Sequence, residues 1–193
     1  VRFIGNRSSG KMGYAIAGAA FLRGADVTLI SGPSQEIPYQ EIKLIKVRSA
    51  EEMSREVHRY FSSSSIFIMS AAVADYKPSK ISPSKIKKEK VKLTSINVSG
   101  TIDILNSIVK KNQFVVGFAL ETENELTNAG KKLRDKNLDM IILNSLKDKQ
   151  SGFEYDTNKI TVIQKGSKPV KFRLMSKFQC ANKILTEILK SAG

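Results

Sequence analysis

The chain has 193 residues, of which 41% are hydrophobic, and its 32 Lys and Arg residues exceed its 18 Asp and Glu residues by 14. This length fits one domain, and the positive charge favours an anionic partner such as a nucleic acid, an acidic lipid or a phosphorylated metabolite. No apolar run approaches the roughly 18 residues that cross a bilayer. One His and one Cys exclude a zinc cluster and an internal disulfide. We therefore expect a single cytoplasmic domain without a membrane segment. Because the chain begins at Val1 with no signal-peptide pattern, we also expect an excerpt or a processed piece.

The first predicted helix follows a loop that is rich in glycine and serine. Residues 5–13 read GNRSSGKMG, and the amphipathic helix that they open should end near Gly24. Free N–H groups and the positive end of the helix dipole make such a start an anion site. The loop is not a P-loop, because Met12 stands where that motif needs a hydroxyl, and G-x-G-x-x-G is also absent. The residues predicted to bind phosphate are Ser8, Ser9, Gly10 and Lys11.

Two strands and a capped helix are predicted next. Residues 26–31 and 41–47 have strand patterns, and Ser49 begins the capping box S-x-x-E of a helix that ends near Phe61. His58 lies on this helix and is the one His of the sequence, so no second His accompanies it. We interpret it as a packed or surface residue rather than a catalyst.

The stretch from residue 66 to residue 92 changes character twice. Residues 66–69 (IFIM) predict a strand buried on both faces, and the small residues 70–72 would let a ligand approach its carboxyl end. Asp75 is the first acid beyond that edge. Seven lysines and one acid follow in residues 77–92, so residues 77–90 are predicted to form a flexible basic lid over a polyphosphate site. A solvated surface loop is the alternative.

The remaining elements suggest a parallel sheet between helices. Strands are predicted at 91–98, 114–120 and 140–144, helices at 101–112 (capped by Thr101), at 123–137 and from Ser176 to Lys190, and a ribbon at 159–164 and 170–174. Lys132 and Lys136 share one helical face, where they either meet a phosphate or are simply solvated. The expected fold is α/β, a three-layer Rossmann-like fold with a mainly parallel central sheet and a small C-terminal β-ribbon.

Five motifs follow one another along the chain: N-x-S-S-G-K-M-G at 6–13, A-A-V-A-D-Y at 71–76, K-I-K-K at 85–88, G-F-A-x-E-T at 117–122 and G-F-x-x-D-x-N at 152–158. With these motifs the chain resembles phosphopantothenoylcysteine synthetase, the ligase half of the bacterial bifunctional coenzyme A biosynthesis protein. The resemblance implies a homodimer that uses CTP and Mg²⁺ to join 4′-phosphopantothenate to L-cysteine through an acyl-cytidylate. It also implies possible fusion to a phosphopantothenoylcysteine decarboxylase.

The resemblance also implies roles for individual residues. Asn6 would hold the acyl-cytidylate, and Lys85 would lie on the flap that closes over it, so these two are the predicted catalytic residues. The implied nucleotide-binding residues are Met69, Ser70, Ala71, Asp75, Lys85, Ile102, Asp103, Ile104, Leu105, Phe118, Lys132 and Lys136. The residues that would bind the metal ion remain unassigned.

Two departures from the family pattern stand out. The family has a first strand and a glycine-rich turn upstream of the position of Val1, which this chain does not contain. It also has N-P-D-I where this chain has TIDI at 101–104. Two other classes stay open: a nicotinamide-dependent oxidoreductase, which lacks its glycine pattern here, and a nucleic-acid-binding module, whose interleaved aromatics are absent from residues 77–92.

Overall fold

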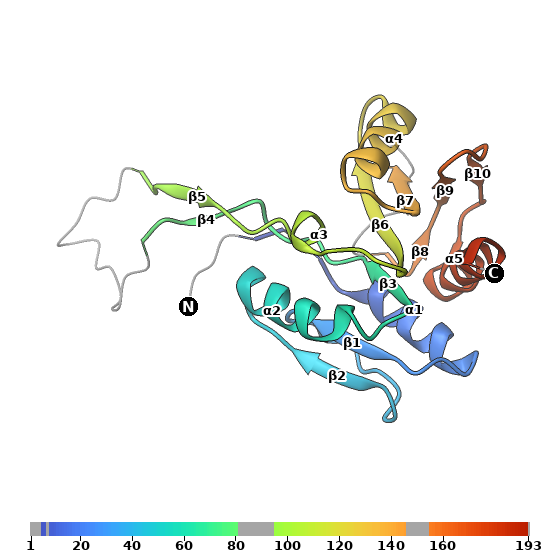
Figure 1. Ribbon diagram of the computed structural model, residues 1–193, viewed down its shortest axis with the longest axis horizontal. Coiled ribbons are helices and arrows are strands. Elements are labelled where there is room, and N and C mark those ends of the chain that lie inside the picture. The colour runs from blue at the N-terminus through green and yellow to red at the C-terminus, as the bar shows by residue number, and fades with distance from the viewer. Residues whose placement is uncertain (1–4, 7, 81–94, 146–154, 193) are drawn as a thin grey trace.

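The computed structural model describes residues 5–6, 8–80, 95–145 and 155–192 (Figure 1). The first half contains α1 (Lys11–Leu22), β1 (Thr28–Ser31), β2 (Lys43–Lys46), α2 (Ala50–Phe61), β3 (Ile66–Met69), β4 (Tyr76–Pro78) and β5 (Val98–Gly100). The second half contains α3 (Ile104–Ser107), β6 (Phe114–Glu121), α4 (Glu125–Asp135), β7 (Met140–Ser145), β8 (Thr157–Asn158), β9 (Ile160–Gln164), β10 (Val170–Lys171), β11 (Met175–Ser176) and α5 (Lys177–Ala192).

The central sheet has five strands in the order β10-β9-β7-β6-β3. Strands β3, β6 and β7 are parallel to one another, β9 is antiparallel to β7, and β10 is antiparallel to β9. A separate parallel pair, β1 and β2, lies beside α2 (Figure 1). The predicted α/β class is therefore confirmed, and the predicted C-terminal ribbon, β9 and β10, extends the main sheet.

Helices cover both faces of this sheet, as the alternating side chains of β7 require. Met140 and Ile142 point toward α1 and α5, whereas Ile141 and Leu143 pack with α4 and the end of α2. All four side chains are almost fully buried. The three-layer arrangement is thus a direct consequence of the apolar run MIIL. Within the described ranges, no helix is long and apolar enough to cross a membrane.

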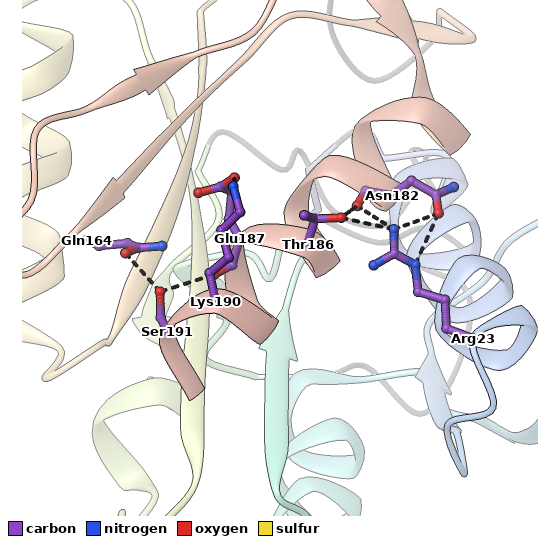
Figure 2. A network of polar contacts seen from close by, with 7 residues as sticks. All are labelled: Arg23, Gln164, Asn182, Thr186, Glu187, Lys190 and Ser191. Carbon is purple, nitrogen blue, oxygen red and sulfur yellow. Dashed lines mark hydrogen bonds and ion pairs between the residues drawn. The ribbon is translucent and has the colours of Figure 1, made fainter. Parts of the chain in front are cut away.

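Hydrogen bonds from Arg23, at the C-terminal end of α1, hold this helix against α5. Figure 2 shows the Arg23 guanidinium reaching α5, where it donates to Asn182 Oδ1 at 2.9 Å, to the Asn182 carbonyl at 2.8 Å and to Thr186 Oγ1 at 3.1 Å. Ser191 Oγ also donates to Gln164 Oε1 at 3.0 Å, which ties the end of α5 to β9. The N-terminus of α1 is therefore carried on a fixed support.

Strands β1 and β3 each leave one edge without a strand partner among the described residues. Both edges line the same large cleft, and apolar side chains of helices on either side, such as Met53 and Val57 of α2 and Ile188 of α5, line it as well. A cleft bounded by two open strand edges and apolar helix faces has the shape and chemistry of a position for one further strand.

Two predictions about elements need correction. The strand at 66–69 was expected to be buried on both faces, but it forms the edge of the sheet and Ile66 is 37% exposed. In place of a helix over 101–112 capped by Thr101, α3 is one turn, and Asp103 caps it by accepting from the Asn106 N–H at 3.2 Å. Beyond it the backbone is extended, and Val109 is 79% exposed, so no apolar face favours a longer helix.

The predicted strand at 91–98 and the predicted lid at 77–90 lie largely outside the described residues and are tested only at 95–98 and 77–80. Residues 81–94 lie outside the described ranges, and the strand β5 starts at Val98. Lys77 and Pro78 belong to β4 rather than to a loop, because β4 pairs with β5 in an antiparallel ribbon that extends away from the sheet (Figure 1).

We expect Gly117→Ala to destabilise the fold. A Cβ atom at Gly117 would lie 2.6 Å from Cδ1 of Leu138, whose side chain is fully buried. Because Leu138 has little room to move, the added methyl group should lower the free energy of unfolding by about 1–3 kcal/mol. Urea denaturation of the two proteins measures this change, and an unchanged midpoint would show that Leu138 can move aside.

Candidate functional site

The cleft opens where β3 ends and β6 continues. Met69, the last residue of β3, pairs with Gly117, so β6 runs four residues further to Glu121. Ser70 and the small residues after it therefore leave the sheet beside Phe118 of β6. The cleft has a volume of about 3270 Å³ and includes the space between β1 and β3. Its polar end lies beyond the carboxyl ends of parallel strands, which is where α/β sheets bind ligands.

Glycines bring the start of α1 to this strand end. Gly10 is the N-cap of α1 and has a φ of +79°, a left-handed conformation that favours glycine. Gly13, in the first turn, approaches β3 so closely that a Cβ atom there would lie 2.9 Å from Ser70 Oγ. The N–H groups of the first turn of α1 are thus placed beside the end of β3, as an anion site requires.

Asn6 joins the glycine loop to the segment that follows β3. Its Nδ2 donates to the Val73 carbonyl at 3.2 Å. From the other side, Thr101 donates its N–H to the Asp75 carbonyl at 2.9 Å and its hydroxyl to the Ala74 carbonyl. Three successive carbonyl groups, of residues 73, 74 and 75, are therefore held by side chains or backbone from distant parts of the chain.

Lys132 is a partly buried cation of the predicted site. It extends from α4 to the middle of β6, where its Nζ donates to the Phe118 carbonyl at 2.8 Å. Burial lowers the pKa of this ammonium below its ordinary value, although the carboxylate of Glu121 opposes the shift. Lys132 thus supplies a positive charge in a partly desolvated wall of the cleft.

Lys136 follows one turn later, just past the end of α4, and forms an ion pair with Asp103. Burial raises the pKa of the Asp103 carboxyl, but hydrogen bonds from Lys136 and from the Asn106 N–H outweigh it, so the pKa lies below its ordinary value. The side chain of Ile104 points into the core beside Val57. Ile104 could therefore meet a ligand in the cleft only through its backbone.

Near Lys11 the structure places three polar residues that were not assigned a role from the sequence, namely Asp156, Asn158 and Lys177. Lys11 Nζ lies 2.5 Å from Asp156 Oδ1, and this hydrogen bond raises the pKa of Lys11. Lys177, at the start of α5, is 6% exposed and donates to the Tyr155 carbonyl, and burial lowers its pKa. Asn158 is 2% exposed and donates to Asn144 Oδ1 at 3.2 Å. The motif at 152–158 was the signal that could have identified Asp156 and Asn158.

The structure brings most of the predicted residues to one cleft. The cleft is lined by Asn6, Ser8, Ser9, Gly10, Lys11, Met69, Ser70, Ala71, Asp75, Phe118 and Lys132. The predicted residues that do not line it are Ile102, Asp103, Ile104, Leu105 and Lys136. Lys85 lies outside the described residues. In the part of the chain that the structure describes, no three His, Cys, Asp or Glu side chains form a cluster that could hold a metal ion.

Comparison with known proteins identifies relatives along almost the whole chain. The family model described as DNA/pantothenate metabolism flavoprotein C-terminal domain matches residues 1–192. A cysteine/cysteine sulfinic acid decarboxylase from an unknown prokaryotic organism is 49% identical over 98% of this chain and 54% of its own length. The coenzyme A biosynthesis bifunctional protein CoaBC of Bacillus subtilis (strain 168) is 42% identical over 97% of this chain and 47% of its own length.

A crystal structure of the C-terminal domain of the bifunctional protein CoaBC has the same fold. It is 36% identical to this chain, with a TM-score of 0.82 over 97% of this chain and 85% of that one. The chain spans about half the length of the curated relatives that it matches.

Proposed function

Because the chain belongs to the family of DNA/pantothenate metabolism flavoprotein C-terminal domains, we propose that it is a phosphopantothenate–cysteine ligase. It activates the carboxylate of 4′-phosphopantothenate with CTP, releasing pyrophosphate, and joins the acyl group to the cysteine amine, releasing CMP. The observation that carries the proposal is the cleft in which the start of α1, Asn6 and Lys132 meet at the carboxyl ends of β3 and β6.

Cations on different walls of the cleft support binding of a nucleoside triphosphate. Lys132 comes from α4, whereas the start of α1 contributes Lys11 and free N–H groups. A triphosphate in this space would displace part of the Lys11–Asp156 pair and would offset the burial of the Lys132 charge. Phe118 and Met69 supply apolar surface beside these cations for a base or sugar.

Asn6 supports the acyl-transfer part of the proposal. Its amide cannot act as a nucleophile or a base, but one N–H already points at the Val73 carbonyl and the second N–H is left to donate. A hydrogen bond to the acyl oxygen would stabilise negative charge that develops there when the cysteine amine attacks. The walls of the cleft would keep water from the mixed anhydride.

Magnesium would assist the attack on the α-phosphate by neutralising charge on the triphosphate. Mg²⁺ sites commonly use one or two carboxylates together with substrate phosphates. Asp75 supplies a carboxylate at the strand end that lines the cleft, so the residues present fit this mode of binding.

Two further parts of the proposal concern assembly. We propose that an extended segment, the first strand of the family pattern, fills the position between β1 and β3 and completes the sheet. We also propose a homodimer through the β4–β5 ribbon, because Tyr76 is 60% and Val98 is 49% exposed on it. A lone two-stranded ribbon is marginal in water, so a second copy would stabilise it. The relatives' greater length supports a fused decarboxylase half.

Product analysis distinguishes this function from its alternatives. The protein is incubated with 4′-phosphopantothenate, CTP, Mg²⁺ and cysteine, and separately with cysteine sulfinic acid, and the products are identified by mass spectrometry. We expect 4′-phosphopantothenoylcysteine and CMP from the first mixture only. Carbon dioxide from the second mixture would favour the decarboxylase named for the first relative. Salt-sensitive binding to nucleic acid without either product would favour a binding module.

Lys85 tests the proposed lid. We expect Lys85→Gln to lower turnover strongly, because only a residue at a defined place on a closed lid contacts the reacting centre. Lys80→Gln removes the same charge from a nearby position and should have a mild effect that fades as salt screens long-range attraction. Turnover of both variants at low and moderate salt decides the matter. Equal losses that both diminish with salt would mean that the segment acts only as an electrostatic attractant.

A further inference from the structure

We propose that Thr101 is a positioning residue that fixes the nucleotide-binding segment after β3. The inference rests on the proposed function and gives Thr101 a role other than the helix cap that was expected from the sequence. Its basis is the pair of hydrogen bonds from Thr101, through its hydroxyl to the Ala74 carbonyl and through its N–H to the Asp75 carbonyl.

Thr101 directly follows Gly100, the last residue of β5, and so lies at the base of the β4–β5 ribbon. The last ladder pair of that ribbon joins Tyr76 to Gly100, and the two hydrogen bonds from Thr101 continue the contact by one step into the segment after β3. Thr101 is half-buried there, so its bonds are partly shielded from water. The hydroxyl that would cap a longer helix after it is used instead on the Ala74 carbonyl.

The residues after Thr101 are firmly anchored. Asp103 pairs with Lys136, and the Ile104 side chain is buried with Val57 and Met53 of α2. His58 of α2 adds a contact from its Nε2 to the Ser107 carbonyl at 3.0 Å. Thr101 therefore connects a fixed support to the segment that would contact the nucleotide.

The carbonyl groups that Thr101 holds are neighbours of the one that Asn6 holds. Residues 73–75 are thus fixed from two sides, with Asp75 at the cleft. Without the Thr101 hydroxyl, the Ala74 carbonyl would lose the hydrogen bond that holds it, and the binding-competent form of the segment would be less populated. Apparent nucleotide affinity falls in proportion to that population.

The test compares three variants of the protein. Thr101→Val keeps the β-branched shape but lacks the hydroxyl. Thr101→Ala lacks both the hydroxyl and the methyl group. Thr101→Ser keeps the hydroxyl and lacks only the methyl group. We expect Thr101→Val and Thr101→Ala to raise the KM for CTP by about three- to tenfold, the loss of one neutral hydrogen bond, with kcat changed less than about twofold. Thr101→Ser should return the KM to within about twofold of the wild-type value.

A merely structural role would give a different result. It would lower the melting temperature and the active fraction, so that kcat falls and KM stays constant. That outcome, or a Thr101→Val variant with the wild-type KM, would overturn the inference. Wild-type protein that neither binds CTP nor releases pyrophosphate would instead overturn the proposed function, so the two failures are distinguishable.

Discussion

Asn6→Asp should lower kcat by about 100- to 1000-fold while the protein stays folded, the effect of removing one donor from a site that stabilises developing negative charge. The replacement has the same shape but exchanges an N–H donor for an anionic oxygen. In the structure that donor faces the Val73 carbonyl, and the proposed mechanism places phosphate and acyl oxygens beside it. The change therefore adds repulsion to a lost hydrogen bond.

Two measurements show whether the loss of kcat is specific to Asn6 or would follow from any Asn-to-Asp change or from unfolding. Asn112→Asp makes the same chemical change on the exposed turn before β6 and should leave kcat unchanged. The melting temperatures of both variants report folding. Wild-type turnover in a folded Asn6→Asp protein would remove Asn6 from the mechanism.

Lys132→Met should weaken CTP binding by about 10- to 100-fold, the equivalent of one charge-assisted hydrogen bond. Methionine keeps most of the apolar stem that crosses from α4 to β6, so the packing should survive. Lys131→Met is the matched control, because Lys131 is exposed on the same helix and carries the same charge. Isothermal titration with CTP measures both affinities, and equal losses in the two variants would mean that only net charge matters.

The lowered pKa of Lys132 also predicts a pH dependence. Burial disfavours the ammonium, so Lys132 loses its proton at a lower pH than an exposed lysine does. CTP affinity should therefore fall as the pH rises through this lowered value, and Lys132→Met should lack that fall. The sign for stability is opposite: the unfolded chain binds this proton more tightly, so unfolding free energy from this group rises with pH between the lowered value and 10.5.

The sequence predicted the elements that depend on local pattern. The apolar runs at Ile66 and Met140 became strands within a residue of the expected bounds, and Ser49 caps α2 by accepting from the Glu52 N–H at 3.2 Å. Ser176 likewise accepts from the Gln179 N–H at the start of α5. These features need only neighbouring residues, so periodicity and capping rules suffice to find them.

The parts that were wrong or missing depend on contacts between distant residues. The helix expected from Thr101 begins two residues later than predicted because Asp103 caps it and because the Thr101 hydroxyl bonds to Ala74, 27 residues earlier. The exposure of Ile66 depends on which strand lies beside β3, which no local pattern reveals. Lys177 became part of the cleft only through α5 packing on α1, an arrangement that spacing alone cannot indicate.

Pyrophosphate release in the absence of cysteine tests the central claim most directly. The protein is mixed with CTP, Mg²⁺ and 4′-phosphopantothenate, and pyrophosphate is measured before and after cysteine is added. Formation of an acyl-cytidylate predicts up to one equivalent of pyrophosphate per site without cysteine, no release without 4′-phosphopantothenate, and continuous turnover once cysteine is present. Cysteine-dependent product without pyrophosphate, or pyrophosphate release that does not require 4′-phosphopantothenate, would contradict the proposed activation of the carboxylate by CTP.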